Sequence, residues 1–273
     1  MIPKGNSESN IQRFTGYSHL YDQYRPEPPA IVPDILSSYR GERPSLVVDV
    51  GCGTGLSTYI WRDHADRVIG VEPNDDMRNT ASSKLALVDQ DAPITFVPGY
   101  SNELPVESEC ADIITCSQSF HWMEPVSTLK EFHRVLKDGG IFAAYDCDWP
   151  PSLDWRLEEK YLHITSKADR LIDSFVAREE QAMKRDKEQH LDQMRQSGAF
   201  RFTKEIVFHH SEQCDADRYV GLAFSQGGVQ TVLKHSSTDL DEDIADFRAL
   251  AEDYFNGRTL EVLFSYRMRI GVK

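Results

Sequence analysis

Short runs of apolar, mostly β-branched residues alternate along the first half of the chain with stretches in which apolar residues recur at helical spacing. Runs of the first kind predict buried parallel strands, and stretches of the second kind predict amphipathic helices that pack on them. We expect helices directly after the first strand, from residue 74 to 88 and from 125 to 136, and therefore a doubly wound α/β sheet. The expected strands lie at residues 46–50, 68–72, 94–97, 111–116 and 141–145.

The second half of the chain is more polar and its pattern is less regular. Residues 154–197 predict a long polar helix, broken near Ser174, whose second half carries a run of charges of both signs at 178–188. Two late strands are expected at 201–208 and 262–272. Between these strands we expect short helices at 215–223 and 228–234 and an acidic amphipathic helix at 239–255.

The first predicted strand runs directly into a cluster of glycines. Gly51, Gly53 and Gly55 occupy alternate positions, where the absence of a Cβ lets the backbone turn sharply and approach a ligand. The free amide groups of the following helix face whatever lies over this turn. The second strand ends in Glu72, about 20 positions after the first glycine of the cluster, and the carboxylate of Glu72 can bind both hydroxyls of a ribose. The pattern predicts a nucleotide-type site at the carboxyl edge of the sheet.

Two classes of cofactor are considered for this turn. A dinucleotide site needs a third glycine or alanine where this chain has Leu56. Asp49, which precedes the first glycine by two residues, would repel a pyrophosphate but suits a ligand with a cationic amino group. Both observations argue against a dehydrogenase, which stays the alternative.

The segment Asp49–Gly55, followed by Gly70–Pro73 and Met77, resembles the class I S-adenosylmethionine-dependent methyltransferases over roughly residues 11–149. The resemblance implies S-adenosylmethionine as cofactor and S-adenosylhomocysteine as product. It also implies an α/β, doubly wound, Rossmann-like sheet of seven strands with the last strand antiparallel, and a helical cap inserted after strand 5. The implied divisions are an N-terminal helical lid at 1–40, a cofactor-binding core at 41–150, a cap at 151–198 and, at 199–273, the rest of the sheet with further cap helices.

The same resemblance implies the residues that contact the cofactor. In this family an acidic residue after strand 3 binds the adenine amino group, but this chain has Tyr100 there, so the expected contacts are ring stacking by Tyr100 and the amide of Ser101. Ser117 offers its backbone near the methionine amino group. The full implied set, which contains no metal ligand, is Asp49, Gly51, Cys52, Gly53, Gly55, Glu72, Pro73, Met77, Tyr100, Ser101, Ser117 and Gln118.

Candidate residues for the reaction itself follow the fourth strand. The run Phe120-His121-Trp122 resembles the trans-aconitate-type and ubiquinone-type branch of the family. One interpretation of His121 is a general base or a hydrogen-bond donor to the substrate. The other is an orienting histidine that is bonded to the backbone. Trp122 is either core packing or part of a cation site.

A tyrosine-rich segment, residues 11–26, precedes the core and ends in Arg-Pro. Similar segments in related methyltransferases fold over the active site, which implies that Tyr17 and Tyr21 line the pocket. Arg25 is expected to bind a carboxylate, either that of the cofactor or that of the substrate, because its fork matches two oxygens. The alternative is a surface helix with packed tyrosines. With His121, the candidate catalytic residues are Tyr21 and Arg25.

The predicted function is methyl transfer to a carboxylate or hydroxyl oxygen of a small molecule by in-line displacement. The alternatives are methylation of a carboxylate on a peptide or natural-product precursor, and a protein that binds S-adenosylmethionine without catalysis. Methyl transfer from a sulfonium needs mainly positioning and exclusion of water, so few catalytic groups are expected.

Composition narrows the partners and the compartment. The formal net charge of −14 over 273 residues argues against nucleic acid as substrate. Residues 1–10 lack an apolar segment typical of a signal peptide, and no apolar run is long enough to span a membrane. The five cysteines are odd in number and show no Cys-x-x-Cys spacing, which predicts reduced residues in the cytoplasm. A monomer or homodimer is expected.

Overall fold

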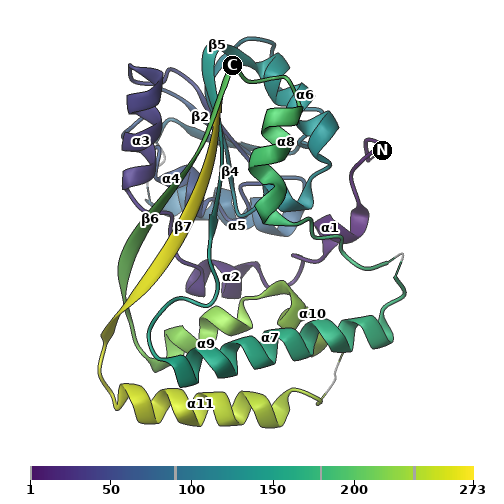
Figure 1. The fold of residues 1–273 in the computed structure, drawn as a ribbon, viewed down its shortest axis with the longest axis vertical. Coiled ribbons are helices and arrows are strands. Elements are labelled where there is room, and N and C mark those ends of the chain that lie inside the picture. Colours follow the sequence, from purple (N-terminus) through teal and green to yellow (C-terminus); the bar gives the residue numbers. More distant parts are fainter. Residues whose placement is uncertain (1, 89–90, 179, 236–237) are drawn as a thin grey trace.

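The computed structural model describes residues 2–88, 91–178, 180–235 and 238–273, and its centre is a seven-stranded sheet of order β3-β2-β1-β4-β5-β7-β6 (Figure 1). The first five strands are parallel, whereas β7 runs antiparallel to both β5 and β6, with Ala143 opposite Ile270. The predicted fold class is therefore confirmed. The strands are β1 (Val47–Val50), β2 (Val68–Val71), β3 (Ile94–Val97), β4 (Ala111–Ser117), β5 (Leu136–Cys147), β6 (Phe202–Cys214) and β7 (Leu260–Val272).

Helices cover both faces of the parallel part of the sheet, so its central strands are apolar on both sides. All four residues of β1 are buried, and their alternation places Val47 in one hydrophobic core and Val48 in the other. No helix of the described residues is both long and apolar enough to cross a membrane. The covering helices are α3 (Ile31–Arg40), α4 (Leu56–Tyr59), α5 (Asp75–Val88), α6 (Pro125–Val135) and α8 (His190–Gln196).

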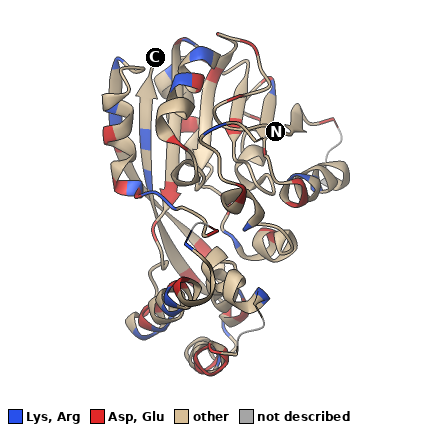
Figure 2. Cartoon of the chain, turned by 90° about the vertical axis from the view of Figure 1, so that its right-hand side faces the viewer, with Lys and Arg blue, Asp and Glu red and all other residues tan. Residues whose placement is uncertain are grey.

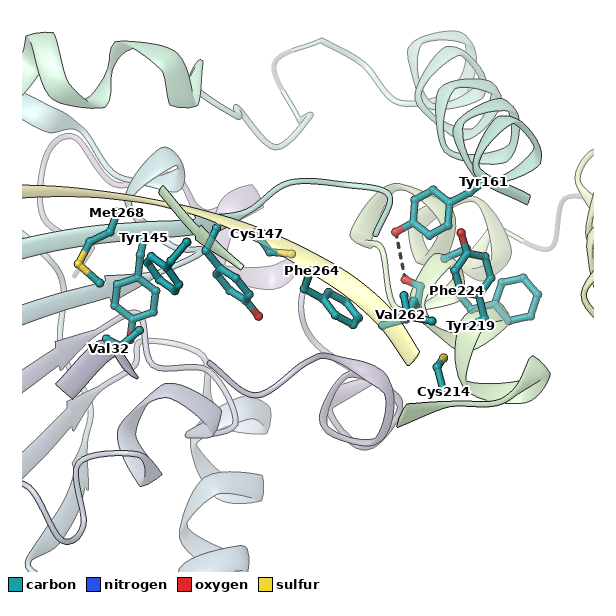
Figure 3. Packing of buried hydrophobic residues seen from close by; sticks show 14 of the residues in the cluster. Val32, Tyr145, Cys147, Tyr161, Cys214, Tyr219, Phe224, Val262, Phe264 and Met268 are labelled. Atoms are coloured by element: carbon teal, nitrogen blue, oxygen red, sulfur yellow. Dashed lines mark hydrogen bonds between the residues drawn. The ribbon is translucent and has the colours of Figure 1, made fainter. Parts of the chain in front are cut away.

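Strands β6 and β7 extend beyond the other strands of the sheet. A group of helices, the cap, lies at their far end, at the bottom of Figure 1. Figure 3 shows that one hydrophobic cluster continues from Tyr145 and Met268 in the sheet to Tyr161 and Tyr219 in the cap. The Tyr161 hydroxyl donates to the Leu222 carbonyl at 3.4 Å. The cap helices are α7 (Trp155–Phe175), α9 (Ala216–Phe224), α10 (Gly227–Lys234) and α11 (Asp241–Phe255).

Two short N-terminal helices, α1 (Glu8–Gln12) and α2 (Ser18–Tyr24), connect the carboxyl edge of the sheet to this cap. The Asn74 side chain, which caps α5 through the Met77 amide at 3.0 Å, also donates to the Ile11 carbonyl at 2.9 Å. At the other end of the segment the Tyr24 hydroxyl donates to Asp217 of α9 at 2.9 Å. The N-terminal segment is thus tied to both parts of the fold.

The break expected near Ser174 lies where α7 ends, at Phe175, and α8 (His190–Gln196) is helical as expected. The expected helix is wrong between these two helices. The charged run at 178–188, of which residue 179 lies outside the described residues, is not a helix until η2 (Lys187–Gln189). Its backbone bonds to other segments instead: the Met183 amide donates to the Asn10 side chain at 2.7 Å, and the Arg185 amide to the His121 carbonyl at 2.9 Å. These tertiary bonds replace the helical bonds that the local sequence would allow.

Candidate active site

A cavity opens at the carboxyl ends of β1, β2 and β4, where the glycine turn lies. The N-terminal segment forms its opposite wall. Of the predicted cofactor-binding and catalytic residues, the cavity is lined by Gly51, Cys52, Gly53, Glu72, Pro73, Met77, Tyr100, Ser101, Ser117, Gln118, Tyr21 and Arg25. The structure therefore brings together residues that are far apart in the sequence.

The glycine turn has a backbone that only glycine adopts without strain. Gly51, Gly53 and Gly55 have φ angles of 68°, 56° and 84°. A Cβ on Gly51 would lie 2.7 Å from the Ser119 Cβ, whereas a Cβ on Gly53 would meet nothing within 4 Å. The backbone at Gly53 thus borders open space, which is the shape expected where a ligand approaches the main chain.

Glu72 stands directly after β2 and lines the cavity, although only 8% of it is exposed. Its carboxylate accepts bonds from the Gly53 amide at 2.9 Å and the Asn74 amide at 2.8 Å. Burial raises the pKa of Glu72 to about 7, despite the two amide bonds that favour the charged form. A buried carboxylate in this position is suited to accept two hydroxyl groups of a ligand.

We predict that binding of S-adenosylhomocysteine weakens about tenfold as the pH falls from 8.5 to 5.5. The sign follows from Glu72, because its carboxylate is charged above a pKa of about 7 and loses acceptor strength when protonated. Titration calorimetry at several pH values measures the change. A Glu72→Gln variant should show a flat profile, and an equal slope in that variant would contradict the assignment.

Asp49 and Gly55 are the two predicted cofactor residues that do not line the cavity. The Asp49 side chain is fully buried in β1 and accepts bonds from Ser57 at 3.2 Å, Thr58 at 2.8 Å and Thr115 at 2.8 Å. Burial raises its pKa to about 6. In this structure Asp49 holds the turn to the following helix and to β4.

The loop after β4 places Gln118 at the cavity in a left-handed backbone conformation, with a φ of 53°. This conformation is uncommon outside glycine and is held by a bond from the Gln118 amide to the Tyr145 carbonyl at 2.9 Å. The side-chain oxygen of Gln118 accepts from Trp149 at 3.4 Å and from Lys187 at 3.3 Å. Gln118 is therefore fixed from β5 and from η2.

His121 does not line the cavity, contrary to a direct role on the substrate. It is 4% exposed in η1 (Phe120–Trp122), with Nδ1 at 3.5 Å from an Asp146 oxygen. Burial lowers the pKa of His121 to about 3, so the ring is neutral at ordinary pH. The ring thus faces the Asp146 carboxylate rather than the backbone partner expected of an orienting histidine, and that role stays a prediction. Trp122, its neighbour, does line the cavity.

Sequence reasoning missed part of the cavity wall. Asn6, Ser7, Asn10 and Phe14 line it from the N-terminal segment, and Ser119 lines it from the loop after β4. Residues 1–10 gave no signal because their polar composition is also that of an unstructured tail. Asn10 is held at the cavity by bonds to the carbonyls of Trp122 and Met183, which are 112 and 173 positions away.

Comparison with known proteins agrees with this geometry. Residues 48–144 match the family model of a methyltransferase domain. The Saccharomyces cerevisiae protein CRG1, named a "probable S-adenosylmethionine-dependent methyltransferase", is 28% identical over 137 residues, which are 50% of this chain and 47% of that protein. The malonyl-[acyl-carrier protein] O-methyltransferase of Hamiltonella defensa is 25% identical over 141 residues, 51% of this chain and 52% of the relative. The chain thus spans about half the length of these curated relatives.

A solved structure of a protein assigned as a type II methyltransferase, from Anaeromyxobacter dehalogenans, superposes with a TM-score of 0.64. It covers 91% of this chain and 98% of its own, at 17% identity, so the likeness concerns the fold. Residues 48–144 thus match a methyltransferase domain, and the sheet around them shares the fold of this methyltransferase structure. The predicted resemblance is confirmed at this level, and the trans-aconitate-type branch stays a prediction.

Proposed function

We propose that this protein is an S-adenosylmethionine-dependent methyltransferase that methylates a carboxylate oxygen of a small organic acid. The observation that carries the proposal is the single cavity joining the glycine turn and Glu72 to Tyr21 and Arg25 of the N-terminal segment. One end of this cavity fits a nucleoside, and the other end offers a cation and a phenol to an acceptor.

The residues at the first end fit the cofactor. Glu72 is suited to bind the ribose hydroxyls, and the open backbone at Gly53 leaves room for the ligand. Tyr100 and Ser101 would hold the adenine, and Ser117 and Gln118 the methionine part. When bound, S-adenosylmethionine supplies a sulfonium methyl group, whose S–C bond breaks toward sulfur as the acceptor oxygen forms the new O–C bond.

The groups at the second end favour a carboxylate over a hydroxyl acceptor. A hydroxyl must lose its proton, whereas a carboxylate is already a nucleophile. The cavity wall formed by the described residues contains no histidine, and burial raises the pKa of Tyr21 above its ordinary value, so that phenol donates a hydrogen bond rather than removing a proton. The malonyl relative, whose name states O-methylation, is consistent with this choice.

The acceptor is tested by supplying radiolabelled S-adenosylmethionine with a panel of small carboxylic acids and of matched alcohols and phenols. Methyl esters release labelled methanol in base, whereas methyl ethers do not. Base-labile product from one or more acids supports the proposal. Base-stable product alone would move the acceptor to a hydroxyl, and no product with saturable cofactor binding would favour a non-catalytic binding protein.

A further inference from the structure

Two arginines at the junction of the N-terminal segment and the cap form no ion pair with a carboxylate of the described residues. The Arg13 guanidinium stacks on the Trp122 ring at 4.1 Å from its centroid, and the Arg25 guanidinium stacks on Trp149 at 4.8 Å. Within the described parts of the chain, neither arginine has an acidic oxygen within ion-pair distance, and each has a buried Nε without a hydrogen-bond partner. Elsewhere in this protein of net charge −14, acidic and basic side chains are interspersed over the helices (Figure 2).

Both arginines reach the start of α10. Arg25 Nη2 donates to the Ser225 carbonyl and to the Gln226 side chain, each at 3.0 Å. Arg13 Nη2 lies so close to Gly227 that a Cβ there would stand 2.4 Å from it. Gln226, the N-cap residue, provides no side-chain cap, so the first amide groups of this helix have no acceptor from it. The positive end of the helix therefore adds to the two cations.

Tyr17 supplies a second, independent sign of a missing acceptor. It is 6% exposed, and its hydroxyl has no hydrogen-bond partner. Burial raises the pKa of Tyr17 to about 12, although both Arg13 and Arg25 act on it in the opposite direction, so the phenol remains a donor. A buried donor beside two unpaired guanidinium groups is what a carboxylate would satisfy.

Asp169 of α7 and Lys184 are exposed residues whose charges act on Arg13. A Cβ on Gly228 would stand 2.7 Å from an Asp169 oxygen, so this carboxylate lies beside the start of α10, and its charge also acts on Arg13. Its negative charge opposes an incoming anion, which would compete with Asp169 for Arg13. Arg25 and Trp122 also line the main cavity, so this place adjoins the substrate end of that cavity.

We propose that Arg13, Tyr17, Arg25 and the start of α10 form an anchoring subsite for a carboxylate that is not the one being methylated. The substrate is then a small dicarboxylic acid, whose second carboxylate lies in the main cavity. Arg13 does not line that cavity, and pairing with guanidinium groups would make a carboxylate a weaker nucleophile. The inference rests on the proposed methyl transfer and adds the class of acid.

The test measures binding of dicarboxylates from malonate to adipate, at constant ionic strength, to protein saturated with S-adenosylhomocysteine. At least one of them should bind the wild-type protein and bind Arg13→Met about tenfold more weakly, because two charge-assisted bonds are lost. Arg13→Lys should fall between the two, and Asp169→Asn should bind more tightly because the repelling charge is gone. Arg170→Met, which removes an exposed arginine from the same helix as Asp169, is the matched control and should be unchanged.

Each other outcome is decisive. If S-adenosylhomocysteine binds every variant but no dicarboxylate binds, or if binding is equal in Arg13→Met and Arg13→Lys, the subsite is wrong while the methyltransferase assignment stands. If butyl phosphate binds through Arg13 and the dicarboxylates do not, the carboxylate class is wrong. If S-adenosylhomocysteine itself fails to bind wild-type protein, the proposed function fails.

Discussion

Replacing Glu72 with alanine is expected to weaken binding of S-adenosylhomocysteine by about 1.5–3 kcal/mol, the range for hydrogen bonds to a charged group. The carboxylate lines the cavity at the end of β2 and is already oriented by the amides of Gly53 and Asn74. Its geometry is therefore fixed before the ligand arrives, and little ordering cost offsets the bonds it makes. Titration calorimetry at pH 8, where the carboxylate is mainly charged, measures the loss.

The matched control is Asp75→Asn, because Asp75 is an exposed acid at the start of α5 that pairs with Arg78. It should leave affinity unchanged. A second readout separates a binding role from a structural one. The pKa of Glu72 is raised to about 7 in the folded chain, so its charged form opposes folding above that pH and this cost is absent below the ordinary pKa.

Glu72→Gln should therefore be at least as stable as the wild-type protein at pH 8 while binding the ligand less well. A loss of stability together with unchanged affinity would make Glu72 a structural residue. Residues that oppose folding yet improve binding are expected at a functional site, because selection for binding tolerates the cost.

Replacing Asp146 with alanine is expected to destabilise the fold by about 3–5 kcal/mol, because Lys187 loses its carboxylate partner and the buried Arg269 keeps only Glu205 and Glu188. Asp146 is 3% exposed near the end of β5, and Lys187 Nζ lies 3.0 Å from it and Arg269 Nη1 3.6 Å. His121 and His190 each approach it within 3.5 Å. Burial raises the pKa of Asp146, but Lys187 and the two histidines outweigh burial and hold that pKa well below its ordinary value.

Asp148→Ala provides the control two residues further along the chain. The Asp148 side chain is 45% exposed and pairs with Arg267, itself 39% exposed, at 3.1 Å. Such a pair contributes at most about 1 kcal/mol. Chemical unfolding of both variants measures the difference, and equal stabilities would show that the Asp146 cluster does not hold β5, β7 and η2 together. The same result would remove the structural role assigned to His121.

The local parts of the site could be predicted from the sequence because their chemistry is local. The glycine turn needs residues of one type within five positions, and Glu72 follows from the length of one strand–helix–strand unit. The orientation of His121 could not be predicted, because it depends on Asp146, which reaches it from the next strand. For the same reason the sequence alone could not decide whether His121 acts as a base.

The N-terminal segment and the cap depend on contacts between distant segments. Asn10 bonds to Met183, and Arg25 bonds to Ser225 and Gln226, about 200 positions away, so no spacing rule applies to them. The charged run near Met183 has the composition of a solvated helix, yet its backbone bonds to α1 and to η1. Arg13 gave no signal in the sequence, since a single arginine near a tyrosine is common on protein surfaces.

The central claim is that the glycine turn and Glu72 bind S-adenosylmethionine, and the most direct test is a thermal melt with S-adenosylhomocysteine run beside NAD. At a ligand concentration about 100 times its dissociation constant, binding stabilises the fold by about 2.7 kcal/mol, which raises the midpoint of a chain of this size by roughly 5–10 °C. The account predicts this rise with S-adenosylhomocysteine alone. No rise with it, or a rise with NAD, would contradict the assignment of the turn and the substrate proposals that depend on it.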